Sequence, residues 1–214
     1  TEKNYDFRKR LLEIHKPDRR DYAIEPRSNE IQIDDEWDII IPEGASRVIL
    51  NAAKDLQDYL FVSMGVSVRM KKAEDIKREC EGGVNTIVLL TRENHSSLAK
   101  ELDTPRSYRI ICSDDKVILC GYDDRGTAQA SYYLEDLMNF KRAPILQEID
   151  ECRKPLFSPR MVHSGYGLDM FPDAHLNAIA HAGMDAILVF TKDVDITPKG
   201  YLDFNELIYR AAGY

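Results

Sequence analysis

The sequence lacks a long apolar segment. Although 43% of its 214 residues are hydrophobic, no uninterrupted hydrophobic run approaches the roughly 20 residues that a membrane helix needs. The N-terminal residues, Thr1-Glu2-Lys3-Asn4, have none of the features of a secretory signal peptide. Because the sequence does not start with Met, an earlier signal could have been removed. We therefore expect no membrane span, and leave the compartment open, with a periplasmic or secreted location if a signal was removed.

Basic residues are also fewer than acidic residues. The 29 Lys and Arg residues are outnumbered by 37 Asp and Glu residues, which gives a formal net charge of -8. Binding to nucleic acid or to an anionic membrane surface depends on a basic patch. The densest cationic stretch, Arg8 to Arg20, is interrupted by apolar residues and is typical of an amphipathic helix. The composition therefore disfavours nucleic acid as a partner.

Motifs for metals, cofactors and nucleophilic catalysis are missing as well. The four cysteines are far apart and form no Cys-x-x-Cys pair of the kind found in zinc or redox sites. There is no Gly-x-Ser-x-Gly nucleophile elbow and no Gly-x-Gly-x-x-Gly dinucleotide motif. Gly121 to Gly126 has the spacing of a phosphate loop, but Thr127 stands where the motif requires Lys. We expect neither a cofactor nor a metal ion.

The patterns that are present predict an α/β domain, a mixed β-sheet with helices packed on it. The first clear helix begins at a capping Ser46, shows one apolar face and stops at Gly65. The run at 86–90 is apolar throughout, which is typical of a central strand buried on both faces. The other predicted elements are short strands at 31–33 and 38–41, a strand at 66–70, a hairpin of 108–112 with 117–120, and a helix starting near Arg125.

The pattern changes after a charged connector at 150–155. From there a strand at 160–163, a helix at 173–182, a strand at 186–190 and a helix opened by Asp203 alternate. Parallel sheets and β/α barrels begin with this alternation. We therefore divide the sequence into a lead-in at 1–28, with a short helix around 7–14, an α/β domain at 29–151, and the first two units of a TIM-like barrel at 152–214.

Two strand-helix units do not make a barrel. They cannot close an eight-stranded ring, and they leave one edge of the second strand uncovered. We therefore expect this sequence to be a fragment of a longer protein. The uncovered barrel edge also predicts self-association.

Six short stretches carry a resemblance to known proteins: Tyr108-Arg109-Ile110-Ile111, Val117-Ile118-Leu119-Cys120-Gly121, Asp124-Arg125-Gly126-Thr127-Ala128-Gln129-Ala130, Lys154-Pro155-Leu156-Phe157-Ser158-Pro159-Arg160, Phe171-Pro172 and Gly183-Met184-Asp185-Ala186. Over about residues 30–214 the sequence resembles one group of enzymes, the β-N-acetylhexosaminidases, α-glucuronidases and related glycoside hydrolases. That resemblance implies a hexosaminidase-like N-terminal α/β domain followed by a catalytic (β/α)8 barrel. Met161 stands where hexosaminidases usually have Gly, which argues against an N-acetylhexosamine substrate.

Four residues around the first barrel strand are candidates for substrate binding: Arg160, His163, Tyr166 and Asp169. Barrel enzymes bind substrates at the carboxyl ends of strands and in the loops that follow. By resemblance, Arg160 binds the terminal sugar, and its guanidinium can grip two hydroxyls; the alternative is an ion pair at the domain junction. His163 could donate to a hydroxyl or be a structural hydrogen-bonding group. Tyr166 could stack on a sugar ring or only cover the barrel rim.

No catalytic residue is expected within the sequence. Glycoside hydrolysis requires paired carboxyl groups, or one carboxyl group and a substrate amide, and the resemblance places that pair after the fourth barrel strand. The adjacent acids Asp34-Asp35, Asp114-Asp115 and Asp123-Asp124 fall in predicted turns, where Asp is favoured for its own hydrogen bonds. The sequence thus predicts the N-terminal portion of a glycoside hydrolase acting on oligo- or polysaccharides, inactive alone. The alternatives are a non-enzymatic carbohydrate-binding or assembly module and a flavodoxin-like ligand binder.

Overall fold

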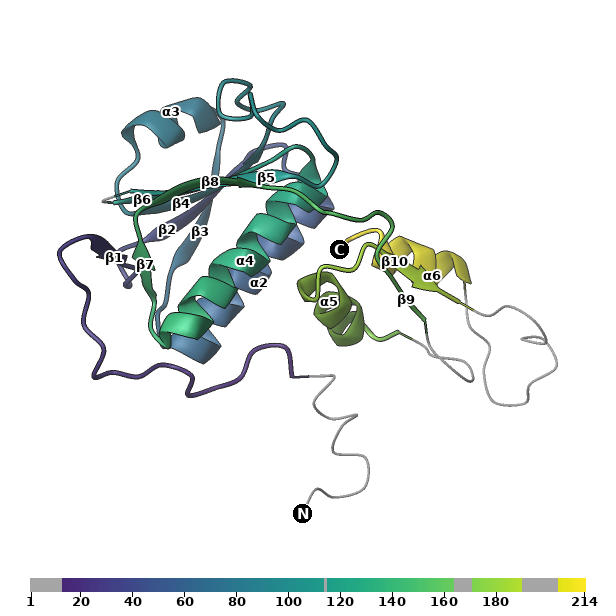
Figure 1. Cartoon of the computed structure of the whole chain (residues 1–214), viewed down its shortest axis with the longest axis horizontal. Coiled ribbons are helices and arrows are strands. Elements are labelled where there is room, and N and C mark those ends of the chain that lie inside the picture. Colours follow the sequence, from purple (N-terminus) through teal and green to yellow (C-terminus); the bar gives the residue numbers. More distant parts are fainter. Residues whose placement is uncertain (1–12, 114, 164–170, 190–203) are drawn as a thin grey trace, which may run out of the picture. The chain divides into compact units, whose positions relative to one another are not determined.

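The computed structural model describes residues 13–113, 115–163, 171–189 and 204–214, and these form two compact units (Figure 1). His15–Pro155 form the sheet unit. Leu156–Tyr214 form the β9–β10 unit, to which Thr1–Ile14 are also assigned. The helix predicted around 7–14 lies largely outside the described residues.

The sheet unit is built on one six-stranded mixed sheet, which confirms the predicted α/β class. Its strands lie in the order β3-β2-β4-β6-β5-β8. The first four of these run parallel to one another, whereas β5 is antiparallel to both β6 and β8. The strands are β2 (Asp38–Pro42), β3 (Arg69–Ala73), β4 (Thr86–Thr91), β5 (Tyr108–Ser113), β6 (Lys116–Gly121) and β8 (Ile149–Arg153).

Helices cover both faces of this sheet. α2 (Arg47–Met64) and α4 (Asp124–Lys141) pack side by side on one face, and the short α3 (Ile76–Gly82) lies on the other (Figure 1). The Ser46 hydroxyl caps α2 by accepting from the Ile49 amide, and Gly65 ends the helix in the left-handed conformation with φ 64°. The Asp123 carboxylate caps α4 by accepting from the Gly126 amide at 2.8 Å.

The core lies on both sides of β4, in which all six residues are buried. Val88 and Leu90 contribute to a cluster under α3, where Cys80 and Cys120 are also buried. Because side chains alternate along a strand, Leu89 points to the opposite face, toward α2 and α4. Burial raises the pKa of the Cys80 thiol to about 11, so this cysteine acts as a packing residue.

Two further strands were not predicted from the sequence. β7 (Ile145–Gln147) pairs antiparallel with β1 (Glu30–Gln32) in a separate two-stranded sheet. β8 forms most of the stretch interpreted as a connector at 150–155, and that interpretation is wrong. The strand was hidden because it lies at a sheet edge, where its side chains are half-buried or exposed and need not alternate in polarity.

The β9–β10 unit contains one parallel strand pair and two helices. β9 (Met161–His163) pairs in parallel with β10 (Ala186–Leu188), and α5 (Asp173–His181) connects them. α6 (Phe204–Ala211) follows β10. The small core of this unit consists of Phe171, Leu176 and Leu207. The predicted strand-helix alternation is therefore present.

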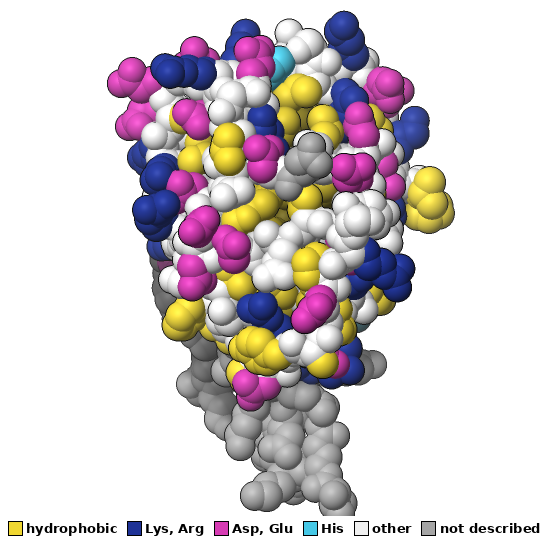
Figure 2. Space-filling view, turned by 90° about the vertical axis from the view of Figure 1, so that its left-hand side faces the viewer, with side chains coloured by type: hydrophobic (Ala, Val, Ile, Leu, Met, Phe, Trp, Pro, Cys, Tyr) yellow, Lys and Arg dark blue, Asp and Glu magenta, His cyan; other side chains and the backbone are white. Residues whose placement is uncertain are grey.

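The described surface carries charges of both signs. Figure 2 shows Lys and Arg side chains interspersed with Asp and Glu on one face, rather than gathered by sign. On the edge strand β3, the charged residues Arg69, Lys71 and Lys72 are all exposed. Within the described ranges, no helix combines the length and the apolar character needed to cross a membrane.

Candidate functional site

Arg160 lies immediately before β9, at the amino end of the parallel strand pair. Its backbone amide donates to the Asp185 carboxylate, and its carbonyl accepts from the Asp185 and Ala186 amides at 2.9 and 3.1 Å. Its guanidinium Nε lies 3.7 Å from the second Asp185 oxygen, and that carboxylate is 3% exposed. Arg160 and Asp185 therefore join the starts of β9 and β10, so this ion pair lies within the β9–β10 unit and both roles considered for Arg160 stay predictions.

Of the other predicted binding residues, only His163 is described by the structure, and it lies at the opposite end of β9. His163 is its last residue, pairs in register with Leu188 of β10 and is exposed. Tyr166 and Asp169 lie outside the described residues. The structure therefore puts His163 at the carboxyl end of a parallel strand, while Arg160 is at the amino end.

A second candidate site, missed by the sequence reasoning, is a cavity of about 380 Å³ in the sheet unit. It lies where the parallel strands β4 and β6 end and where α2 and α4 begin. The sequence signal that could have indicated it is the Gly121 to Gly126 spacing, which does follow a strand and open a helix. The lining residues are Val48, Thr91, Arg92, Glu93, Tyr122, Asp123, Asp124 and Arg125.

Two glycines let α4 begin directly against the strand ends. A Cβ on Gly121 would lie 2.2 Å from the Thr127 amide nitrogen, and one on Gly126 would lie 2.4 Å from the Ser107 carbonyl oxygen. The Thr127 hydroxyl donates to the Leu90 carbonyl of β4 at 2.7 Å. The Arg92 amide donates to the Gly121 carbonyl at 2.8 Å and so links the ends of β4 and β6. The wall of the cavity is thus fixed by backbone contacts.

The polar side chains of this cavity are of mixed charge. The Arg92 guanidinium lies over the Tyr122 ring, 3.5 Å from its centroid. Asp123 accepts from the Gly126 amide and also from the Arg106 amide, at 2.8 and 3.1 Å. Both carboxylate oxygens of Asp123 therefore hold the backbone before and at the start of α4.

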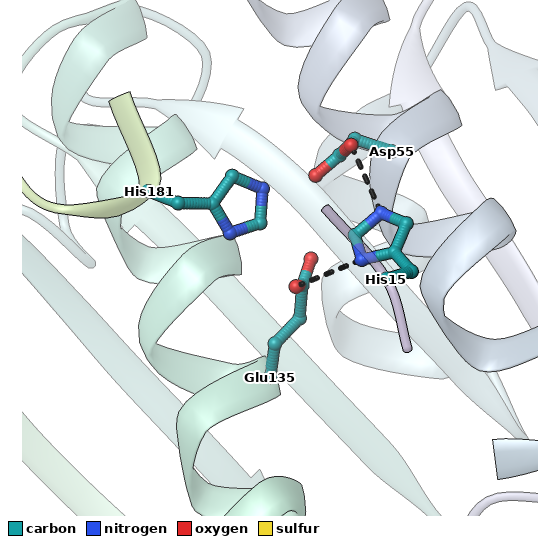
Figure 3. Close-up of side chains that lie close together, drawn as sticks. All are labelled: His15, Asp55, Glu135 and His181. Atoms are coloured by element: carbon teal, nitrogen blue, oxygen red, sulfur yellow. Dashed lines mark hydrogen bonds and ion pairs between the residues drawn. The ribbon is translucent and has the colours of Figure 1, made fainter. Parts of the chain in front are cut away.

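A buried cluster between the N-terminal segment and the two long helices was also missed. Figure 3 shows the His15 imidazole between two carboxylates, with Nε2 at 3.0 Å from Asp55 and Nδ1 at 3.9 Å from Glu135. Burial, and then the charge of Asp55, raise the pKa of Glu135 well above its usual range. The Tyr59 hydroxyl lies 3.1 Å from the Glu135 carbonyl oxygen and its ring meets the His15 ring edge-on.

The ligand atoms of His15, Asp55 and Glu135 lie within 4.8 Å of one another, close enough for a metal ion. However, each ring nitrogen of His15 faces a different carboxylate. The ring cannot direct a lone pair at one ion and also keep both contacts. This geometry favours a side-chain bridge in which the imidazole lies between the two carboxyl groups, and the expectation of no metal site stays a prediction.

The adjacent acids that the structure describes are engaged with the backbone. Asp34 accepts from the Glu36 amide at 3.0 Å, and Asp35 accepts from the Ser67 amide at 2.7 Å. Asp123 has the helix-capping role given above. The Asp34 contact is the local one expected of Asp in a turn, whereas Asp35 holds a distant amide and Asp123 caps a helix.

Comparisons with known proteins show the fold and no family. No family model matches the sequence, and no curated protein matches it. Among solved structures, CpGH84B is similar with a TM-score of 0.58 and 16% identity, over 92% of this chain and 35% of that protein. BtGH115A, a family GH115 4-O-methyl-α-glucuronidase with specificity for decorated arabinogalactans, is similar with a TM-score of 0.55 and 10% identity, over 86% of this chain and 28% of that protein.

Both of these proteins are glycoside hydrolases, and this chain spans about a third of the length of each. At such low identity the likeness establishes a glycoside hydrolase-like fold alone. It agrees with the predicted α/β class.

Proposed function

We propose that this chain is the N-terminal portion of a glycoside hydrolase that cleaves glycosidic bonds of oligo- or polysaccharides. The observation that carries this proposal is the likeness of 92% and 86% of the chain to parts of two glycoside hydrolases. The parallel pair β9–β10, joined through α5, supports it, because β/α barrels are built from such repeats. On this proposal, the α/β domain is hexosaminidase-like and the strand pair is the start of a barrel.

The catalytic carboxylates are proposed to lie outside this chain. The described pairs Asp34-Asp35 and Asp123-Asp124 serve turns and a helix cap, and so do not offer the spaced carboxyl groups that glycoside hydrolysis needs. His163, Tyr166 and Asp169 would contribute to the sugar pocket from the carboxyl side of β9. Arg160 stays a candidate with two roles, sugar binding or the Asp185 ion pair.

The direct test is to compare this chain with a longer one that carries further strand-helix units. On a panel of chromogenic glycosides, the longer chain is expected to turn over at least one substrate and residues 1–214 none. Appreciable turnover by residues 1–214 would contradict the proposal. A longer chain that binds sugars without hydrolysing any would instead support the alternative of a non-enzymatic carbohydrate-binding module.

The roles of the strand-end residues can be separated in the longer, active chain. His163→Ala is expected to raise KM, because it removes a polar group from the substrate side of β9. Arg160→Ala should do the same if it binds sugar, whereas loss of a junction ion pair should lower the unfolding temperature and leave KM unchanged.

A further inference from the structure

The cavity in the sheet unit lies where the chain leaves the sheet in opposite directions. After β4, the chain passes to the α3 face, where Ala99 and Leu102 pack in the same cluster as Cys80. After β6, it enters α4 on the other face (Figure 1). In sheets of parallel strands, ligands bind in the crevice formed where neighbouring connections diverge in this way.

Two arginines that line the cavity, Arg92 and Arg125, can donate hydrogen bonds to a ligand. The Tyr122 ring covers one face of the Arg92 guanidinium and so restrains its orientation. Arg92 also lines the cavity, and its N–H groups lie in the plane of the guanidinium, where the ring does not cover them. Among the residues that the structure describes, no ion pair involves Arg92 or Arg125. A planar guanidinium of this kind can donate two parallel hydrogen bonds to neighbouring oxygen atoms of a ligand.

The charge balance of the lining selects the class of ligand. Glu93 and Asp124 offset Arg92 and Arg125, and the carboxylate of Asp123, held by two backbone amides, adds a further negative charge, so the lining has no excess of positive charge. A phosphate or sulfate would meet these carboxylates, and the loop has no Lys after Gly126 to offset them. A neutral molecule that carries many hydroxyls can instead accept from the guanidinium groups and donate to the carboxylates. A volume of about 380 Å³ is at the small end of ligand pockets.

We propose that this cavity at the ends of β4 and β6 binds a neutral mono- or disaccharide, with Arg92 and Arg125 as donors and Glu93 and Asp124 as acceptors. The proposal goes beyond the hydrolase function and does not depend on it. A binding test needs only this chain and no turnover, so its outcome and that of the hydrolysis test are independent.

The test is an NMR titration of the ¹⁵N-labelled chain with glucose, galactose, xylose, N-acetylglucosamine and lactose, with glucuronate as the charged comparison. At least one neutral sugar should shift the backbone amides at 91–93 and 122–125 in a saturable way, and glucuronate should bind no better. Arg92→Ala is expected to weaken binding about tenfold, as for loss of one charge-assisted hydrogen bond. Arg92→Lys should weaken it too, because Lys keeps the charge but not the planar fork.

Arg78→Ala is the matched control, since it removes an exposed arginine of α3 that does not line the cavity. It should leave the affinity unchanged. Unaltered fluorescence of the buried Trp37 shows that each variant is folded. If Arg92→Ala does not fold, Arg125→Ala takes its place in the test. The proposal is overturned if no neutral sugar shifts these amides, if glucuronate alone does, or if a folded arginine variant binds as tightly as the unmodified chain.

Discussion

β4 and β9 are both strands in parallel pairing, but they differ in what covers them. β4 lies between β2 and β6, has helices over both faces of its sheet, and is buried along its whole length. β9 is three residues long, is exposed or half-buried, and pairs with β10 alone among the described strands. Parallel pairing is normally found in sheets covered on both faces. The difference indicates that the free energy of folding in the described residues comes mainly from the sheet unit.

Truncating one core side chain in each unit gives the largest expected effect. Leu89→Ala opens a cavity in the fully buried β4 and should lower the free energy of unfolding by about 2–5 kcal/mol. Val162→Ala, in the half-buried centre of β9, should lower it by less than about 1 kcal/mol. Urea unfolding followed by Trp37 fluorescence reports the sheet unit, and far-UV circular dichroism reports the helices of both units. Equal decreases in the free energy of unfolding for the two variants would contradict the difference between β4 and β9.

A smaller effect on stability is expected where α4 begins against the ends of β4 and β6. Gly121→Ala places a methyl group 2.2 Å from the Thr127 amide nitrogen, so backbone must move, at a cost of about 1–3 kcal/mol. Gly44→Ala is the control, because a Cβ there has no neighbouring atom within 4 Å. Thermal unfolding of both variants measures the difference. If Gly121→Ala were as stable as Gly44→Ala, the ends of β4 and β6 would be less tightly built than the structure indicates.

The third effect concerns the buried acid of the sheet unit, Glu135; it depends on pH and is smallest just above pH 4.5. Because the pKa of Glu135 is raised from its usual 4.5, the folded chain keeps a proton that the unfolded chain loses. The stability from this group is therefore complete below pH 4.5 and is lost as pH rises toward the folded pKa, by up to about 1.4 kcal/mol per pH unit. Glu135→Gln removes this loss, so its stability relative to the unmodified chain should increase with pH.

Chemical denaturation at several pH values above 4.5 checks this expectation. Glu81→Gln is the control, since it makes the same change at an exposed residue of α3, on the opposite face of the sheet, and should leave the pH profile unchanged. A constant difference between Glu135→Gln and the unmodified chain at every pH would show that Glu135 is ionised in both states.

The elements with strong local patterns could be predicted from the sequence. α2 has a capping serine, a terminal glycine and one buried face, and its bounds agree with the prediction to within a residue or two. The short α3 was missed because only Ile76 and Cys80 are buried within it, too few to give a helical period. β8 was missed because an edge strand is stabilised by hydrogen bonds to β5 rather than by buried side chains. Such pairing between distant segments leaves little mark on the local sequence.

The candidate sites were harder to predict, for a related reason. The cavity at the ends of β4 and β6 collects residues from three segments, and only the glycine spacing before Thr127 pointed to it. His15, Asp55 and Glu135 are separated by 40 and 80 residues along the chain, so no motif could connect them. Arg160 was expected within the first strand of the second unit; it lies just before β9, and its contact with Asp185 depends on the register of β9 with β10.

The arrangement of the sheet unit as one uninterrupted stretch, His15–Pro155, has a consequence for synthesis on the ribosome. All the strands of its six-stranded sheet are available once residue 155 has emerged, so the unit can complete its core before the following residues have emerged. β9 must wait for β10, whose register partners follow 25 residues later. During that interval the exposed Arg69, Lys71 and Lys72 of the edge strand β3 disfavour pairing of this edge with neighbouring nascent chains, because such pairing would bring their charges together.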